Sequence, residues 1–225
     1  IYNIDIRLAY QLIEGVFFDT NIVNIDSLKQ LEEYSYKVAG TVGLMMCSIM
    51  NINNDTLLKH AVELGVAMQI TNICRDVKED LVINRIYIPK EFRGFNFTSK
   101  NDLLYNEEKK KILSENIKLL IEKSNRLYSQ SEIGTMKLPF KYRIVILIAS
   151  RLYKEIGIKI FKDPNIIWKE RVFVSFPVKM LIIFLCLLKS IFPLKILNIP
   201  KKNTRNTNFY KKYYFNKCKT PKITK

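Results

Sequence analysis

Hydrophobic residues recur every three or four positions along most of the chain, which is the period of amphipathic helices. The pattern predicts a helix over residues 5–18, a long helix that begins after a candidate N-cap at residues 26–27 and runs to about residue 50, and another over about 56–80. No segment alternates polar and apolar residues as a half-buried strand does, and no internal repeat occurs. We therefore expect an all-α fold.

Proline marks further boundaries along the chain. Pro89 lies in a segment over residues 84–97 that is predicted to be an irregular lid or connector. An amphipathic, lysine-rich helix is expected over 99–130, and a further helix over 140–160 is ended by Pro164.

A continuous apolar run over residues 180–188 lies between Lys179 and Lys189. The run is too short to cross a bilayer, which takes about 20 residues. Three alternatives stay open: a buried core helix, an interfacial helix followed by a basic tail, and a tilted span extended to residue 199.

The net charge of +16 is concentrated at the C-terminal end, because residues 201–225 contain eight Lys, one Arg and no acidic residue, which gives +9. Basic segments bind nucleic acid or anionic membranes, or stay solvated. The interspersed aromatic residues favour an interface, and no nucleic-acid-binding motif is present. We expect a helical domain over 1–178, an apolar and membrane-interfacial segment over 179–200 and a disordered tail over 201–225, with peripheral membrane contact through 179–225 and no nucleic-acid partner.

The composition is that of a compact protein. Hydrophobic residues make up 48% of the chain, and Gly and Pro number only seven each, which argues against disorder. The four cysteines have no C-x-x-C spacing, so reduced buried thiols in a cytoplasmic protein are expected rather than a zinc site or disulfides. The single histidine, His60, is expected to be structural rather than a ligand.

Four polar side chains fall on one face of the predicted helix over residues 56–80. Gln69, Asn72, Asp76 and Asp80 are offset by 0, 3, 7 and 11 positions. At about 100° per residue these offsets span roughly 80° of the helix and about 16 Å of its length. The preceding residues are mostly apolar, and buried carboxylates are costly without a cation or a hydrogen-bonding partner. Such a row of oxygen ligands suits Mg²⁺ shared with a substrate phosphate, and a solvated helix face is the alternative.

The sequence around this row resembles the squalene/phytoene synthase family, and bacterial phytoene synthases most closely. Six segments carry the resemblance, and they occur in the same order as in the family. The resemblance covers residues 5–180. The segments are 34–45, 64–80, 84–89, 138–143, 149–153 and 170–175. The resemblance implies an isoprenoid synthase fold, which is a helical bundle around a central cavity, and Mg²⁺-dependent head-to-head condensation of two prenyl diphosphates.

The resemblance also implies roles for individual residues. Asp76 and Asp80 match the second aspartate motif of the family and, with Asn72, would bind Mg²⁺, or Mn²⁺ in its place. The expected catalytic residues are Asp76, Asp80, Arg75, Tyr34 and Tyr153. The expected substrate-binding residues are Gln69, Asn72, Arg85, Arg171, Val38 and Gly43.

The expected chemistry explains these residue types. Mg²⁺ and arginine stabilise a departing pyrophosphate, and the allylic cation that remains needs a dry wall because water would trap it. An aromatic face such as that of Tyr34 stabilises a passing cation. Gly43 and Gly65 are expected to let two helices approach while leaving room for isoprenoid tails. Core packing is the alternative for the glycines and tyrosines, and an ion pair with Glu170 is the alternative for Arg171.

One part of the family pattern is not found. The first aspartate motif would lie upstream of residue 1, and Asp5, Glu14 and Asp19 are not spaced to replace it. Asp19 instead resembles a G-x-x-x-D turn of the family. We expect a segment of several tens of residues, with the N-terminal helices of the fold, to be absent, and this chain alone to be inactive in the full reaction.

The leading expectation is a transferase of carotenoid biosynthesis that converts two geranylgeranyl diphosphates to phytoene through prephytoene diphosphate. One alternative is a synthase that makes squalene or dehydrosqualene from farnesyl diphosphate, because residues at the cavity floor cannot be located from the sequence. A non-catalytic family member acting as a scaffold is the other. We expect a cytoplasmic protein, peripheral to the inner face of the membrane.

Overall fold

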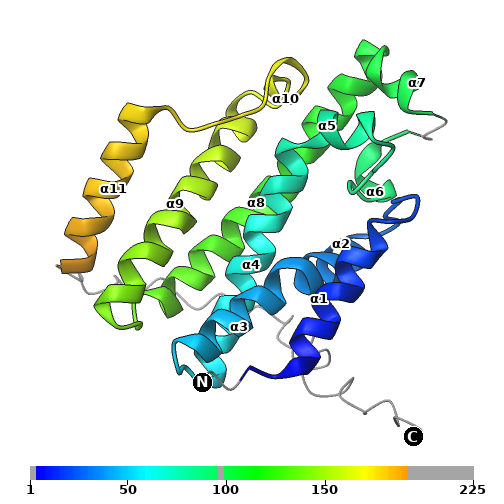
Figure 1. Ribbon diagram of the computed structural model, residues 1–225. Helices are drawn as coiled ribbons and strands as arrows, with labels where there is room; N and C mark the ends of the chain where they lie inside the picture. The colour runs from blue at the N-terminus through cyan, green and yellow to red at the C-terminus, as the bar shows by residue number, and fades with distance from the viewer. Residues whose placement is uncertain (1–3, 96–98, 192–225) are drawn as a thin grey trace, which may run out of the picture. The chain divides into compact units, whose positions relative to one another are not determined.

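The computed structural model describes residues 4–95 and 99–191, and this part of the chain is helical (Figure 1). The helices are α1 (Ile6–Phe18), α2 (Leu28–Ser35), the π-helical η1 (Tyr36–Gly40), α3 (Thr41–Ile49), α4 (Asp55–Arg75), α5 (Val77–Val82), α6 (Lys90–Arg93), α7 (Lys100–Leu104), α8 (Glu107–Thr135), α9 (Phe140–Lys162), α10 (Ile166–Lys169) and α11 (Phe176–Ile191). Within these residues no strand forms, and one isolated bridge joins Asn24 to Ile86. The all-α fold class is confirmed. Residues 192–225, with the expected basic tail, lie outside the described residues.

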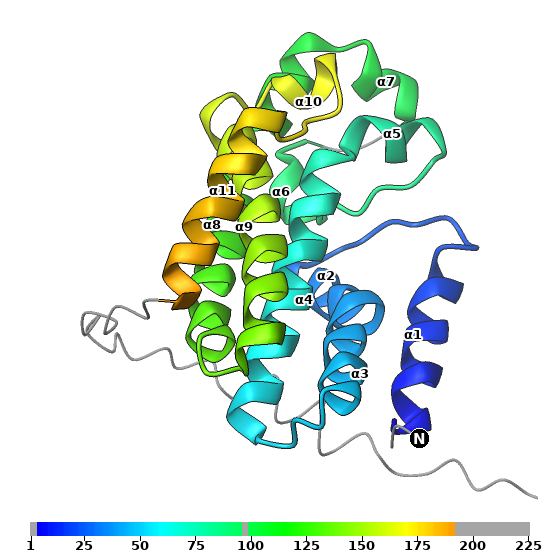
Figure 2. The ribbon, with the colours of Figure 1, turned by 60° about the vertical axis from the view of Figure 1, so that its left-hand side comes forward.

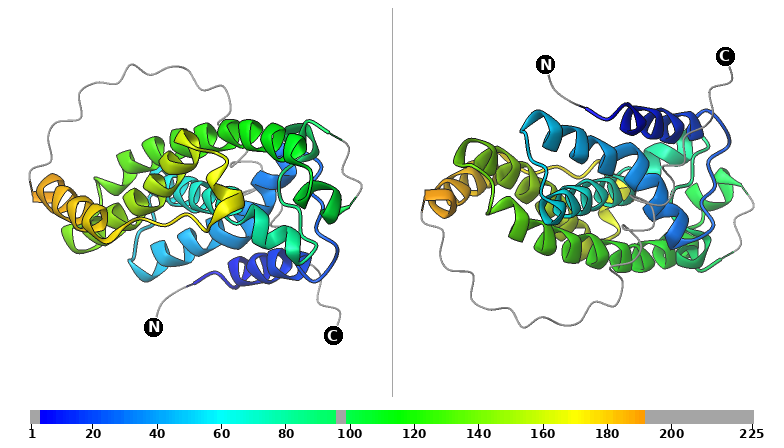
Figure 3. Two further views of the ribbon diagram at one scale, coloured as in Figure 1. Left: turned by 90° about the horizontal axis from the view of Figure 1, so that it is seen from above. Right: turned by 90° about the horizontal axis from the view of Figure 1, so that it is seen from below.

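Helix α4 is the central element of the described fold. It packs against α8 and α9 and also against η1 and α3, and α1 covers η1 and α3 (Figures 2 and 3). Its buried residues include Val66, Ile70 and Ile73. The buried hydroxyl of Thr71 shares a 3.0 Å hydrogen bond with Tyr128 of α8. These contacts hold α4 in place between two groups of helices.

Side-chain caps explain where several helices begin. The Ser27 hydroxyl accepts a hydrogen bond from the backbone of Gln30, so the predicted N-cap at residues 26–27 is confirmed at Ser27. The prediction of a single helix over 99–130 is wrong. The chain leaves the helix after α7, and the Asn106 side chain caps α8 by accepting from the Lys109 backbone at 2.9 Å.

The long helix predicted to end near residue 50 is present, but its middle turn is π-helical at η1, a feature that is frequent at functional sites. It crosses α4 at two glycines. A Cβ on Gly43 would lie 2.7 Å from the Ala61 carbonyl oxygen, and one on Gly65 would lie 2.5 Å from the Ala39 carbonyl oxygen. The predicted close approach of two helices is therefore confirmed, and it depends on the missing side chains.

The prediction of one continuous helix over 56–80 is wrong at its C-terminal end. Helix α4 ends at Arg75, and Asp76 has φ −99° and ψ 18° before α5 begins. The backbone amide of Asp80 still donates to the Asp76 carbonyl oxygen at 2.8 Å. At this break, both carboxylate oxygens of Asp76 accept hydrogen bonds from arginine side chains.

Helix α11 exposes most of its apolar side chains. Phe176 is 73% exposed and Phe184 is 56% exposed, whereas Cys186 and Ser190 are buried. The buried-core alternative for residues 180–188 is therefore wrong for the described part of the chain. Among the described residues, no helix is both long and apolar enough to cross a membrane.

Candidate active site

A cavity of about 340 Å³ runs along one face of α4. From Leu57 to Asn72, eight residues of α4 line it, in a pattern that repeats every four positions as expected for one face of a helix. Residues between Val38 and Met50 line it from the other long helix, and the end of α8 and part of α9 complete the wall. Most of the lining is aliphatic, so the cavity suits a hydrocarbon chain.

One end of the cavity is polar. Gln69, Asn72 and Tyr153 lie there, at the end that leads to Asp76 and Asp80. The side-chain oxygen of Asn72 is buried and accepts no hydrogen bond from any described residue. A buried amide oxygen without a donor is costly, so this atom is suited to bind a cation or a ligand donor.

Asp76 lies in a cluster of charges beside this end. Arg75 donates to both Asp76 oxygens at 2.8 and 2.6 Å, and Arg171 donates to one of them at 3.1 Å. Burial acts to raise the pKa of Asp76, but the hydrogen bonds with the two arginines outweigh it and hold the pKa below its ordinary value. Asp76 is thus an anion, and the alternative of an Arg171–Glu170 ion pair is not what the structure shows.

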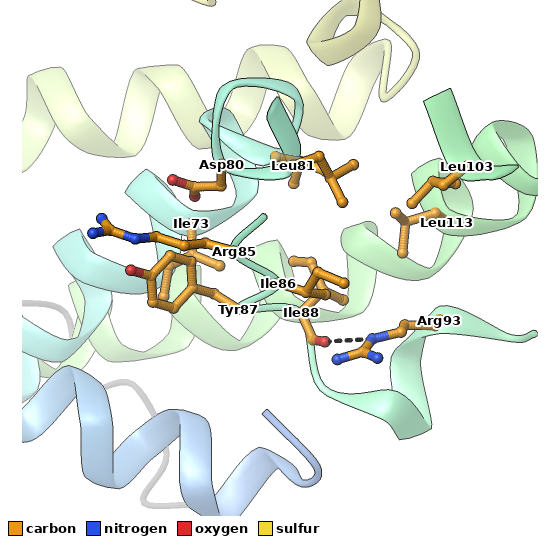
Figure 4. A pocket seen from close by; sticks show the side chains of 11 residues that line it. Ile73, Asp80, Leu81, Arg85, Ile86, Tyr87, Ile88, Arg93, Leu103 and Leu113 are labelled. Atoms are coloured by element: carbon orange, nitrogen blue, oxygen red, sulfur yellow. Dashed lines mark hydrogen bonds between the residues drawn. The ribbon is translucent and has the colours of Figure 1, made fainter. Parts of the chain in front are cut away.

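Asp80 differs from Asp76 in its surroundings. It forms no ion pair with any described residue, and burial raises its pKa to about 7. The Asp76 carboxylate adds to this increase, while Arg85 opposes it. Figure 4 shows Asp80, Arg85 and Tyr87 directed to the same side of the loop. A half-buried carboxylate with a raised pKa and no paired cation is a suitable partner for a metal ion.

Asp19 also lies at this site, although the sequence predicted only that it belongs to a turn. It accepts hydrogen bonds from Tyr34 at 3.0 Å and Tyr87 at 2.8 Å, and its backbone oxygen accepts from Arg85 at 2.9 Å. The Tyr34 and Tyr87 rings lie 5.1 Å apart, and burial is the main reason that the pKa of Tyr34 is raised. The only signal in the sequence was the G-x-x-x-D resemblance; Tyr87 had none beyond its place in residues 84–89.

The structure divides the predicted site residues into three groups. Gln69, Asn72, Val38, Gly43 and Tyr153 line the cavity. Arg75, Asp76 and Arg171 form the charged cluster, next to Asp80 and Arg85. Tyr34 is not among the described residues that line the cavity, and its hydroxyl is bound by Asp19. The roles assigned to these residues stay predictions.

Residues able to hold a metal ion are few. In residues 4–95 and 99–191 no three or more His, Cys, Asp or Glu side chains gather as a metal site. Asp76, Asp80 and the free side-chain oxygen of Asn72 would supply at most part of the ligands of a metal site. This is compatible with Mg²⁺, which is commonly bound through one or two carboxylates together with substrate phosphates and water. The described cysteines Cys47, Cys74 and Cys186 are buried free thiols, as predicted.

The helical bundle with an apolar cavity and a carboxylate-bearing polar end defines an isoprenoid synthase fold. Among solved structures, a dehydrosqualene synthase in complex with a ligand matches with a TM-score of 0.68 and 27% identity, over 84% of this chain and 67% of that chain. The squalene synthase HpnC from Alicyclobacillus acidocaldarius matches with a TM-score of 0.64 and 18% identity, over 72% of this chain and 61% of that one. The predicted isoprenoid synthase fold is thus confirmed.

The chain belongs to the squalene/phytoene synthase family. The family model described as "Squalene/phytoene synthase" matches residues 2–177. The 15-cis-phytoene synthase of Enterobacter agglomerans is 31% identical over 172 residues, which are 76% of this chain and 58% of that relative. The phytoene synthase of Rhodobacter capsulatus is 32% identical over 156 residues, which are 69% of this chain and 46% of that relative. The chain therefore spans about half the length of these relatives.

Proposed function

We propose that the protein to which this chain belongs joins two prenyl diphosphates head to head, and that its substrate is geranylgeranyl diphosphate. Two molecules would give phytoene through prephytoene diphosphate. The observation that carries the proposal is the position of the cavity: its apolar lining along α4 leads through Gln69 and Asn72 toward Asp76 and Asp80, which lie just beyond the end of this helix. Such a site accommodates a hydrocarbon tail with a diphosphate at its end.

Asp76, Asp80 and Asn72 would hold Mg²⁺, or Mn²⁺ in its place. When bound, the ion supplies positive charge that stabilises the departing pyrophosphate. The free oxygen of Asn72 and the unpaired Asp80 carboxylate support this assignment.

Arg75, Arg85 and Arg171 would bind the diphosphate. Arg75 and Arg171 already contact Asp76, so they lie beside the expected cation and can turn part of their donor capacity to phosphate oxygens. Arg85 is anchored by one nitrogen to the Asp19 backbone, which leaves its other donors for the substrate. These three cations compensate the charge that develops as the C–O bond breaks.

The cavity wall would protect the allylic cation from water. Val38 and Gly43 offer no nucleophile, and the Tyr153 ring at the polar end can face the cation. Val42 and Met46 line the cavity but remain 40% and 45% exposed, so the described residues leave this side open to solvent. This opening supports the expectation that the chain alone does not complete the reaction.

Binding of a non-ionisable analogue, geranylgeranyl thiolodiphosphate, tests the site without requiring turnover. At a concentration of 100 times Kd the ligand stabilises the fold by about 2.7 kcal/mol, or about 5–10 °C in Tm for a chain of this size. Asp80→Asn should lose the Mg²⁺-dependent part of the shift, whereas the control Glu79→Gln removes a charge at the exposed neighbouring position and should retain it. A shift that is the same in EDTA as in Mg²⁺ would contradict the metal assignment.

Two alternatives are separated by related measurements. A farnesyl-specific synthase would yield squalene or dehydrosqualene when a full-length relative carrying these residues is given both diphosphates. A scaffold protein would show no thermal shift with either analogue. Formation of phytoene by the 225-residue chain with geranylgeranyl diphosphate and Mg²⁺ would refute the expectation that it is inactive alone.

We also propose a cytoplasmic protein in peripheral contact with the membrane through residues 179–225. The exposed apolar face of α11, which includes Phe176 and Phe184, and the charge of the following segment support it. Co-sedimentation with phosphatidylcholine vesicles containing phosphatidylglycerol should fall for Phe184→Asp and for deletion of 201–225. The control Ile22→Asp, at an 89% exposed loop position, should bind as the unmodified chain does.

A further inference from the structure

A buried hydrogen bond joins α8 to α4 just before α4 ends. The Tyr128 hydroxyl of α8 lies 3.0 Å from the Thr71 hydroxyl of α4, and the two residues are 1% and 0% exposed. Neither is among the described residues that line the cavity. Thr71 is followed directly by Asn72, which does line it, and α4 ends at Arg75. The bond therefore lies behind the turn that presents polar side chains to the cavity.

The direction of this hydrogen bond follows from the single proton that each hydroxyl carries. Thr71 donates its proton to the Ala67 carbonyl oxygen of its own helix at 2.9 Å. The Thr71 oxygen can then only accept from Tyr128, so Tyr128 is the donor. Burial is the main reason that the pKa of Tyr128 is raised, and the phenol therefore keeps this proton at neutral pH.

The bond fixes how the end of α4 is turned about its own axis. Successive residues of a helix point about 100° apart, so an anchor on the Thr71 side sets the direction of Asn72 on the cavity side. Asp76, which follows the helix, has φ −99° and ψ 18°, so α4 is not continued there. The orientation of the last turn thus depends on side-chain contacts with neighbouring helices.

A second tyrosine reaches the same turn from α9, which packs beside α4 and α8 (Figure 2). The pKa of Arg75 is raised first by its hydrogen bond with Asp76 and to a smaller degree by Tyr153 of α9. Tyr153 and Arg75 also act on the pKa of Tyr128, after burial and the bond with Thr71. Side chains of three helices therefore meet at the polar end of the cavity.

We propose that Tyr128 is a positioning residue for the diphosphate site, and that it acts through Thr71 to orient the last turn of α4. The turn presents Asn72 to the cavity and Arg75 to Asp76, so a change in its orientation moves two of the groups proposed to hold the cation and the diphosphate. This inference rests on the proposed function, because a diphosphate is what the turn would bind. Loss of one net hydrogen bond corresponds to about three- to tenfold in an equilibrium constant.

Tyr128→Phe tests the proposal because it removes the hydroxyl and keeps the ring. Binding of inorganic pyrophosphate in Mg²⁺ reports the polar end alone, and binding of geranylgeraniol reports the apolar cavity alone. The variant should weaken pyrophosphate about three- to tenfold and change geranylgeraniol by less than about twofold. Equal loss for both probes, or loss for neither, would mean that the hydroxyl serves stability only and would overturn the proposal.

Ser124→Ala is the matched control on the same helix. The Ser124 hydroxyl is also buried, but it donates to the Ile121 carbonyl oxygen of α8 at 2.9 Å and does not reach α4. This variant should leave the affinities for both probes within about twofold. A loss of pyrophosphate binding as large as that of Tyr128→Phe would show that any lost hydroxyl of α8 has this effect, which the proposal excludes.

Substitutions at Thr71 test the route by which Tyr128 acts. Thr71→Ser keeps the hydroxyl and should bind pyrophosphate within about twofold of the unmodified chain. Thr71→Val leaves the Tyr128 proton without an acceptor, whereas the double variant Thr71→Val/Tyr128→Phe replaces both partners by apolar groups and should regain stability. Its affinity for pyrophosphate should stay as low as that of the weaker single variant. Losses that multiply, or an affinity that returns with stability, would contradict the route through Thr71.

Hydrogen exchange separates this inference from the proposed function, because it needs no ligand. The Asp76 amide donates to the Asn72 carbonyl oxygen at 2.8 Å, and the Met50 amide at the end of α3 donates to Met46 at 3.0 Å. Tyr128→Phe should speed exchange about tenfold more at Asp76 than at Met50. If the unmodified chain binds no pyrophosphate in Mg²⁺, the proposed function fails, while faster exchange at Asp76 would still show that Tyr128 orders this turn. Equal changes at the two amides would overturn the inference whether or not pyrophosphate binds.

Discussion

Replacement of Gly65 by alanine tests the contact on which the cavity depends, namely the crossing of α4 and η1. The added Cβ would lie 2.5 Å from the Ala39 carbonyl oxygen and 2.7 Å from its carbonyl carbon. Both atoms belong to backbone, so no side-chain rotation relieves the overlap. The helices must move apart by about 1 Å to restore ordinary contact distances.

The magnitude follows from two opposing effects. Overpacking of a close contact costs about 1–3 kcal/mol, and the upper value applies here because backbone must shift. Alanine is about 1 kcal/mol more favourable than glycine in a helix interior. The net loss for Gly65→Ala is about 2 kcal/mol, which corresponds to a Tm lower by about 4–8 °C.

Gly157→Ala on α9 is the matched control. A Cβ there would lie 3.6 Å from a methyl carbon of Ile121, which is ordinary contact. This variant should be more stable by about 0.5–1 kcal/mol through helix propensity alone. Thermal and urea unfolding followed by circular dichroism measures both. If the two variants change stability in the same direction, the close crossing at Gly65 is wrong.

Three further substitutions test other contacts, each by urea unfolding. Ser27→Ala removes the N-cap of α2 and should cost about 1 kcal/mol, whereas Ser27→Asp should retain most of the stability; equal loss in both would contradict the cap. Tyr34→Phe removes the hydrogen bond to Asp19 and should cost about 1 kcal/mol, and no loss would mean that this bond contributes nothing. Burial acts to raise the pKa of Glu132, but the Lys189 hydrogen bond and Arg151 outweigh it and hold the pKa below its ordinary value of 4.5. The stability from these pairs is therefore present above pH 4.5 and lost as the pH falls through the depressed value. Glu132→Gln should cost about 1–3 kcal/mol at neutral pH and reduce the loss of stability in acid, and unchanged acid dependence would contradict the assignment.

Local rules account for the parts of the fold that were predicted well. The period of apolar residues placed α1 and α9 within a few residues, and Ser27 marked the start of α2. These features depend on interactions between residues close in the chain. The breaks at Asp76 and before Asn106 were missed. At the break, Asp76 accepts a hydrogen bond from Arg171, which lies far away in the sequence. The cap at Asn106 lies within a segment whose apolar pattern is helical throughout.

The candidate site was likewise predicted only in part from the sequence. The spacing of Gln69, Asn72, Asp76 and Asp80 was enough to suggest a row of oxygen ligands on one helix. The spacing could not show that Arg75 and Arg171 form ion pairs with Asp76 while Asp80 has no paired cation. Ion pairing depends on the distance between side chains, which for Arg171 and Asp76 belong to different elements. The spacing also could not predict that Asp19 lies at the site. Asp19 is held there by hydrogen bonds from Tyr34, Tyr87 and Arg85, which are distant in the sequence.

The sequence by itself determined the helical class, the row of polar residues from Gln69 to Asp80 and the family, because periodicity and ordered motifs are properties of the chain. The tertiary structure decided which residues line the cavity and how far α11 is exposed. The lining depends on which side chains of distant helices meet, here Leu57 of α4 and Ile146 of α9 among others. The apolar run over residues 180–188 was compatible with a buried or an exposed helix. Among the described residues α11 packs mainly against α9, which leaves its outer face uncovered.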